Sequence, residues 1–107
     1  MKQSSTNNPG VDKDKHPAVL KWANIWGDFN GAIFHKEKAP KGRLEFSNLE
    51  TGLKCEGKFD LLFGYHGHWD LNCSSDKSAS GTIKIWPGKI IGEGKSKDGE
   101  KISFRLR

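Results

Sequence analysis

Residues 53–61, LKCEGKFDL, decide the fold class of this 107-residue chain. Apolar or small residues occupy every second position, and charged residues fill the positions between them. The two series are Leu53, Cys55, Gly57, Phe59 and Leu61 against Lys54, Glu56, Lys58 and Asp60. Such alternation is typical of a β-strand with one face in a core and the other in water. We therefore predict a strand here, with the apolar series pointing inward.

The same alternation recurs along the chain. In residues 67–73 the apolar series is Trp69, Leu71 and Cys73, and residues 101–106 repeat the pattern. Turn sequences rich in glycine separate these segments, so the sequence predicts about eight short strands. They lie near residues 18–26, 32–36, 43–48, 53–62, 67–73, 79–86, 89–96 and 100–106. We predict an all-β antiparallel meander that forms a small barrel or a tight sandwich.

The strongest turn signals are Asn30-Gly31 and Asp98-Gly99, because these residues accept the positive φ of two-residue hairpin turns. The region before the first of them also fits a helix. Its apolar residues recur at spacings of three and four: Val19, Trp22, Trp26, Phe29 and Ile33. Since Gly27 and Gly31 weaken a helix interior, we predict strand, turn and strand instead.

The composition predicts a single β domain, residues 17–107, preceded by a tail. The tail, residues 1–16 (MKQSSTNNPGVDKDKH), is polar and basic, contains few apolar side chains and is predicted to be disordered. The chain has no apolar run of the ~20 residues that a spanning helix needs, and its start lacks the apolar core of a signal peptide. If the protein is exported, we expect a signal that was removed ahead of Met1.

The chain is basic, with 18 Lys and Arg, 13 Asp and Glu and a formal net charge of +5. Ordinary solubility explains many such surpluses, but positive charge also attracts anionic partners. Side chains on the outward series predict a surface for an anionic partner, made of Lys54, Lys58, Lys84, Trp86, Lys95, Lys101 and Arg105. We expect the Trp86 ring to be exposed, Trp69 to lie in the core, and either Trp22 or Trp26 to face away from it.

Both cysteines fall on the apolar series of neighbouring predicted strands. A hairpin centred on Gly64 places Cys55 opposite Cys73 and Phe59 opposite Trp69. Opposite residues on one face of a sheet are close enough for a disulfide, so we predict a Cys55–Cys73 bond. Such a bond indicates an oxidising compartment. The alternative is a pair of buried free thiols in a cytoplasmic protein.

Glycine, cysteine and aromatic positions in the second half of the chain form a pattern. They are Cys55-Glu56-Gly57-Lys58-Phe59, Gly67-His68-Trp69, Cys73, Asp76, Ser80-Gly81, Gly92-Glu93-Gly94, Gly99 and Ile102-Ser103-Phe104. This pattern resembles that of small proteobacterial envelope β proteins, periplasmic or lipoprotein, over residues 43–107. The resemblance implies an exported, periplasmic or envelope-associated protein and supplies no active site. The chain departs from the family in its long basic tail.

One set of side chains fits a metal site. His66, His68 and Asp70 alternate on the outward series of one predicted strand, and two histidines with a carboxylate are a common set of metal ligands. No fourth ligand is identifiable, and His16 and His35 cannot be placed beside the set. The other interpretation is a hairpin tip whose polar side chains meet water.

No catalytic arrangement is recognisable, because a nucleophile elbow, a phosphate-binding glycine loop and a thiolate–histidine pair are all missing from the sequence. We predict no enzyme and no cofactor. The preferred function is a small extracytoplasmic binding or structural module that meets an anionic envelope component, or a secreted or periplasmic protein. The alternative is a cytoplasmic barrel that binds single-stranded nucleic acid, with Phe63-Gly64-Tyr65 as a stacking platform.

Overall fold

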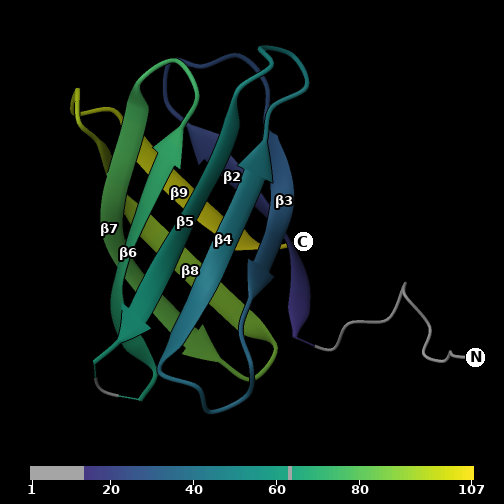
Figure 1. Cartoon of the computed structure of the whole chain (residues 1–107), viewed down its shortest axis with the longest axis vertical. Coiled ribbons are helices and arrows are strands. Elements are labelled where there is room, and N and C mark those ends of the chain that lie inside the picture. Colours follow the sequence, from purple (N-terminus) through teal and green to yellow (C-terminus); the bar gives the residue numbers. More distant parts are fainter. Residues whose placement is uncertain (1–13, 63) are drawn as a thin grey trace, which may run out of the picture.

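The protein is described by a computed structural model over residues 14–62 and 64–107, which contain eight strands. These are β2 (Lys15–Trp22), β3 (Phe29–Phe34), β4 (Lys41–Ser47), β5 (Lys54–Leu61), β6 (His66–Cys73), β7 (Lys77–Trp86), β8 (Lys89–Ser96) and β9 (Lys101–Leu106). Each strand pairs antiparallel with the next, and β9 pairs back with β2, so the sheet closes into a barrel. In Figure 1, β4 and β5 cross the near wall and β8 and β9 the far wall. The predicted meander is confirmed, and it closes as a barrel.

The barrel has two ends, which we name from Figure 1. The upper end carries the loops that follow β2, β4, β6 and β8. The lower end carries the loops that follow β3, β5 and β7, together with the start of β2. Within the described part of the chain, no helix is long and apolar enough to cross a membrane.

The first hairpin differs from the prediction. Asn30 and Gly31, predicted as a turn, lie inside β3, and the chain turns over residues 23–28 instead. Gly31 allows β3 to pack closely against β4, because a Cβ at this position would lie 1.8 Å from the backbone oxygen of Glu45. Asn24 supplies positive φ in the real turn, at 68°. The helical alternative for this region is absent, since β2 and β3 pair as strands.

The start of the folded domain also moves. β2 begins at Lys15, so Lys15 and His16 belong to the barrel and not to the tail predicted for residues 1–16. His16 lies opposite Ile33 of β3, so the barrel extends two residues beyond the predicted boundary at residue 17. Asp14 directly precedes β2, and residues 1–13 of the predicted tail lie outside the described residues.

Inward side chains fill the barrel. The largest fully buried apolar ones are Trp69, Phe29, Phe59, Phe104, Leu20, Ile33, Leu44, Leu71 and Ile83. Trp69 lies in the core as predicted. Its indole Nε1 donates a hydrogen bond to the Thr82 backbone oxygen at 2.9 Å, and its ring meets Phe104 edge-on with 5.2 Å between ring centroids. Gly92, opposite Phe104, makes room for that ring, because a Cβ at Gly92 would lie 2.1 Å from it.

The disulfide prediction is confirmed. Cys55 of β5 lies directly opposite Cys73 of β6, their Cα atoms are 3.9 Å apart, and their sulfurs are bonded. Phe59 faces Trp69 in the same hairpin, as predicted. Because β5 and β6 are neighbours, the bond fixes the register of the hairpin whose alternation first indicated the fold.

Glu100 ties the last hairpin to the first strand. Its Oε1 accepts a hydrogen bond from the Trp22 indole Nε1 at 2.9 Å and a longer one from the Ser96 hydroxyl at 3.3 Å. The bond from Trp22 favours the charged carboxylate, and it lowers the pKa of Glu100 below its ordinary value of 4.5 although partial burial opposes this. The ionised carboxylate therefore stabilises the fold.

Replacing Glu100 by glutamine tests this stabilisation. Because the folded-state pKa is the lower one, the contribution is present above the unfolded-state pKa and is lost as pH falls through the folded-state pKa, below 4.5. We expect E100Q to melt at a lower temperature than the parent at pH ~7 and the gap to shrink towards pH ~3. Thermal unfolding at several pH values measures it, with E37Q in the exposed loop after β3 as control. A gap that does not change with pH contradicts the role of the charge.

Candidate functional site

The barrel distributes the predicted cationic residues over different walls. All seven are exposed, as predicted from the outward series. Lys95 lies on β8 and Lys101 and Arg105 lie on β9, whereas Lys54 and Lys58 lie on β5. β5 is four strands from β9 in either direction around the barrel, so these residues face opposite sides (Figure 1). The remaining two, Lys84 and Trp86, lie on β7. A single flat partner cannot contact all of them.

The wall around β5 carries mixed charge. Lys58 lies across from Asp70 of β6, and Lys41 of β4 forms an ion pair with Asp60 at 3.9 Å. Exposed pairs of this kind contribute little to stability. They do neutralise the wall, so Lys54 and Lys58 stand among acidic side chains and do not form a positive field.

The outward face of β8, β9 and β2 has a different balance. Lys95 and Lys101 lie directly opposite each other, and Lys21 of β2 lies opposite Ser103 of β9. Like charges that face each other across a ladder destabilise a sheet, by up to ~1 kcal/mol. We call this face, with Lys21, Lys95, Lys101 and Arg105, the basic wall.

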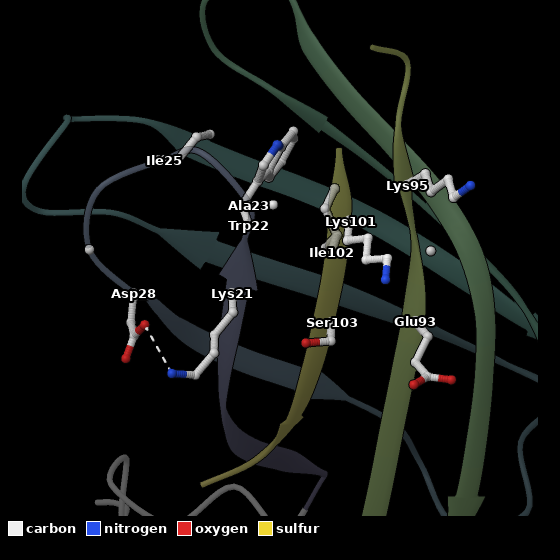
Figure 2. Close-up of a pocket in the computed structure, with 12 residues that line it drawn as sticks. Lys21, Trp22, Ala23, Ile25, Asp28, Glu93, Lys95, Lys101, Ile102 and Ser103 are labelled. Carbon is white, nitrogen blue, oxygen red and sulfur yellow. Dashed lines mark ion pairs between the residues drawn. The ribbon is translucent and has the colours of Figure 1, made fainter. Parts of the chain in front are cut away.

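An open groove of about 750 Å³ crosses the basic wall. Lys21, Glu93, Lys95 and Lys101 line it, and Figure 2 shows the three lysine side chains pointing in different directions. Lys21 leans towards Asp28, with which it forms an ion pair at 3.6 Å. Ammonium groups that diverge cannot close on one small ion, so the arrangement suits an extended anion with several charged groups.

Two of the groove lysines are not neutralised. Within residues 14–62 and 64–107, ion pairs with carboxylates involve Lys21, Lys41, Arg43 and Lys97 but neither Lys95 nor Lys101. Glu93 is the nearest acidic side chain on β8, two positions along from Lys95 on the same face. The basic wall therefore presents two lysines at facing positions whose ammonium groups can donate hydrogen bonds to anionic oxygens.

The predicted metal site is not formed. His66, His68 and Asp70 lie on one side of β6, but alternate residues of a strand are about 6.6 Å apart, so the set spreads along the strand and does not converge. In the described part of the chain, no three His, Cys, Asp or Glu side chains lie close enough to hold a metal ion. Asp70 instead lies between Lys58 and Ser80 on the neighbouring strands.

Of the three exposed aromatic rings in the described residues, two lie at the lower end, away from the basic wall, and Trp26 lies in the loop 23–28, which borders the groove. Trp86 is 38% exposed, as predicted, and its ring lies 6.2 Å from that of Tyr65 at the lower end. Trp22 is buried whereas Trp26 is 78% exposed in the upper loop, so one of the two faces away from the core as predicted. No residue that lines the groove carries an exposed aromatic ring. Phe63, part of the predicted stacking platform, lies outside the described residues.

Lys21 is the groove lysine that the sequence prediction did not include. Its signal was present, because Ala18, Leu20 and Trp22 form the inward series of β2 and leave Lys21 on the outward one. Its position beside β9 was not readable, since the pairing of the first and last strands follows only from closure of the barrel.

Comparison with known proteins bears on the fold. No protein-family model matches the chain, and no curated protein matches it. Among solved structures, a redesigned beta barrel, mFAP1, bound to DFHBI, matches with a TM-score of 0.68 and 15% identity over 87% of this chain and 91% of that chain. A de novo designed fluorescence-activating beta barrel matches at 0.64 and 14% identity, over 92% of this chain and 94% of that chain. The chain shares the fold of these small β-barrels. At such low identity the likeness shows the fold alone.

Proposed function

We propose that this protein is an extracytoplasmic binding module whose basic wall holds an extended polyanion of the cell envelope. The observation that carries the proposal is the pair Lys95 and Lys101, directly opposite each other and without a carboxylate partner in the described residues. Successive carboxylates or phosphates of a polymer offset the positive charge of the two lysines, and Lys21 and Arg105 extend the contact along the wall. The like charges of Lys95 and Lys101 destabilise the sheet in the unbound protein, and a bound polyanion removes this cost.

The disulfide supports the location. Disulfides form and persist in oxidising compartments and are rare in the cytoplasm, so the Cys55–Cys73 bond favours a periplasmic or secreted protein. The resemblance of the glycine and cysteine pattern to envelope proteins points the same way. The barrel mFAP1 is bound to DFHBI, so a barrel of this fold can serve as a binding scaffold.

A single-strand nucleic-acid binder is the weaker candidate. Such proteins combine a positive groove with aromatic rings on which successive bases stack. Here none of the described residues that line the groove carries an exposed ring, and the rings of Trp86 and Tyr65 lie at the lower end. Trp26, in the loop that borders the groove, is a single exposed ring and offers no platform for successive bases. The lack of a row of rings along the groove favours a partner that is recognised mainly by its anionic groups.

The test removes the groove lysines. Polygalacturonate supplies carboxylates and long-chain polyphosphate supplies phosphates, and titration at low salt measures affinity for each. We expect the triple variant K21Q/K95Q/K101Q to bind about tenfold more weakly, from three contacts of ~0.5 kcal/mol each. The matched control is K54Q/K58Q/K84Q, which removes the same charge from β5 and β7.

Three results would overturn the proposal. Equal losses in the two triple variants would show that net charge, and not the basic wall, determines binding. An oligonucleotide that binds more tightly than both polymers at the same salt concentration would favour the nucleic-acid candidate. If the parent protein bound neither polymer, a polyanion would be excluded as its partner.

A further inference from the structure

The lower end of the barrel holds a second cavity, of about 740 Å³, on a different part of the molecule from the basic wall. Inward residues near the lower ends of four strands contribute aliphatic side chains to it: Leu61 of β5, Ile85 of β7, Ile90 of β8 and Leu106 of β9. Leu61, Ile85 and Leu106 are only half-buried although they pack against the core. The barrel therefore exposes an aliphatic floor at this end, which we call the lower mouth.

The lower mouth is shallow. The inward layer above it contains Phe59, Ile83 and Phe104, and each of these is at most 2% exposed. The His35 ring, which lines the mouth, lies 5.6 Å from the Phe59 ring. Because packed side chains close the barrel directly above the floor, a long acyl chain cannot extend along the barrel axis. One or two rings can lie on the floor.

The rim of the lower mouth is aromatic and mainly cationic. The half-exposed Trp86 ring stands at the edge, and the Lys89 ammonium lies 5.6 Å from the centre of that ring. The loop after β3 adds Lys36 and Lys38 to the rim. Two acidic residues, Glu37 of the same loop and Asp14 before β2, partly offset the positive charge of the three lysines. His35 Nε2 donates a hydrogen bond to the Ala39 backbone oxygen at 2.8 Å, which holds this loop beside the mouth.

We propose that the lower mouth binds a small planar amphipathic anion, a molecule of one or two aromatic rings that carries an acidic group. The rings lie on Leu61, Ile85 and Leu106 and against Trp86, and the acidic group meets the lysines of the rim. A concave apolar surface with a few polar groups at its edge is the usual form of a small-molecule site, and barrel mouths are a common place for one. The site is independent of the basic wall and of its polymer.

The probe for the test is 8-anilinonaphthalene-1-sulfonate, which has aromatic rings and one sulfonate and fluoresces in apolar surroundings. We expect saturable binding to the folded parent protein with one molecule per chain. Ile85→Glu places a carboxylate on the floor and Ala39→Trp fills the mouth, and each should weaken binding at least tenfold. The matched control is Ile25→Glu, a half-buried residue that packs against the same core from the upper loop. Thermal melts show that each variant is folded.

Each remaining outcome supports or overturns the proposal. K21Q/K95Q/K101Q should bind the probe as the parent does, and loss of the probe in that variant would place it on the basic wall. Equal weakening by Ile85→Glu and Ile25→Glu would mean that the probe reports loosened packing. If palmitate displaced the probe at a lower concentration than 2-naphthalenesulfonate does, the proposed aromatic ligand would be wrong and an anion with an acyl chain would be favoured. Failure of polymer binding with intact probe binding would refute the proposed function alone.

Discussion

Replacing Trp69 by alanine is expected to lower the free energy of unfolding by about 3–5 kcal/mol, the largest effect of any single substitution proposed for this barrel. Trp69 is 2% exposed and meets both Phe104 and the facing strand residue Phe59. Its removal leaves a cavity in a closed barrel whose strands are held in register by hydrogen bonds, so the walls cannot collapse inward. A small domain has roughly 5–15 kcal/mol of stability in total, so the variant should be close to unfolding.

Urea denaturation followed by circular dichroism measures this loss. The matched control is Trp26→Ala, which removes the same side chain from a position that is 78% exposed, and its effect should stay within about 0.5 kcal/mol. Trp69→Phe should fall between the two, because it keeps part of the buried area but loses the hydrogen bond to Thr82. If Trp69→Ala were as mild as Trp26→Ala, the packed interior described above would be wrong.

Removing the disulfide is expected to cost about 3 kcal/mol. The bonded cysteines are 18 residues apart, and in the chain-entropy model a loop of this size restricts the unfolded chain by roughly that amount. C55A/C73A should therefore unfold at lower urea than the parent. Adding a thiol reductant should move the parent towards the variant and leave the variant where it was.

The comparison between reduced parent and variant is the internal control. Agreement between them would assign the loss to the missing bond and not to the smaller alanine side chains. A parent protein that shows the same urea midpoint with and without reductant, after alkylation confirms that the thiols are free, would contradict a stabilising disulfide.

The hairpin that carries this disulfide was predictable because its information is local. Alternation in residues 53–61 and 67–73 fixes which side chains point inward, and one turn then fixes which residues face each other. Cys55 against Cys73 and Phe59 against Trp69 follow from that register, and both are confirmed. The eight strands follow from the same alternation repeated between glycine-rich turns, whereas the choice between a barrel and a sandwich is made by the pairing of β2 with β9.

Local signals failed where a residue type serves two purposes. The pair Asn30-Gly31 is a strong turn signal, yet Gly31 is needed so that β3 can approach the Glu45 backbone of β4. Lys15 and His16 look like part of a polar tail, but pairing with β3 makes them strand residues. In both cases contacts with a distant segment decide the structure, and neither is visible in the neighbouring sequence.

The candidate sites were only partly predictable for the same reason. Alternation shows that Lys54 and Lys101 face outward but not that they lie on opposite walls, because the wall depends on closure of the barrel. The lower mouth draws side chains from strands at both ends of the sequence, such as Leu61 and Leu106. Alternation placed His66 and Asp70 on one side of a strand, which suggested a shared metal site. Side chains on one side of a strand are spaced along it, however, so these two do not meet at one ion.

Binding of a polyanion along the basic wall is the central claim, and amide chemical-shift mapping of isotopically labelled protein during titration with polygalacturonate tests it most directly. We expect saturable shifts confined to β2, β8 and β9, strongest around Lys21, Lys95 and Lys101, with the amides of β5 unchanged. Shifts centred on Lys54 and Lys58, or shifts spread evenly over all strands, would contradict it.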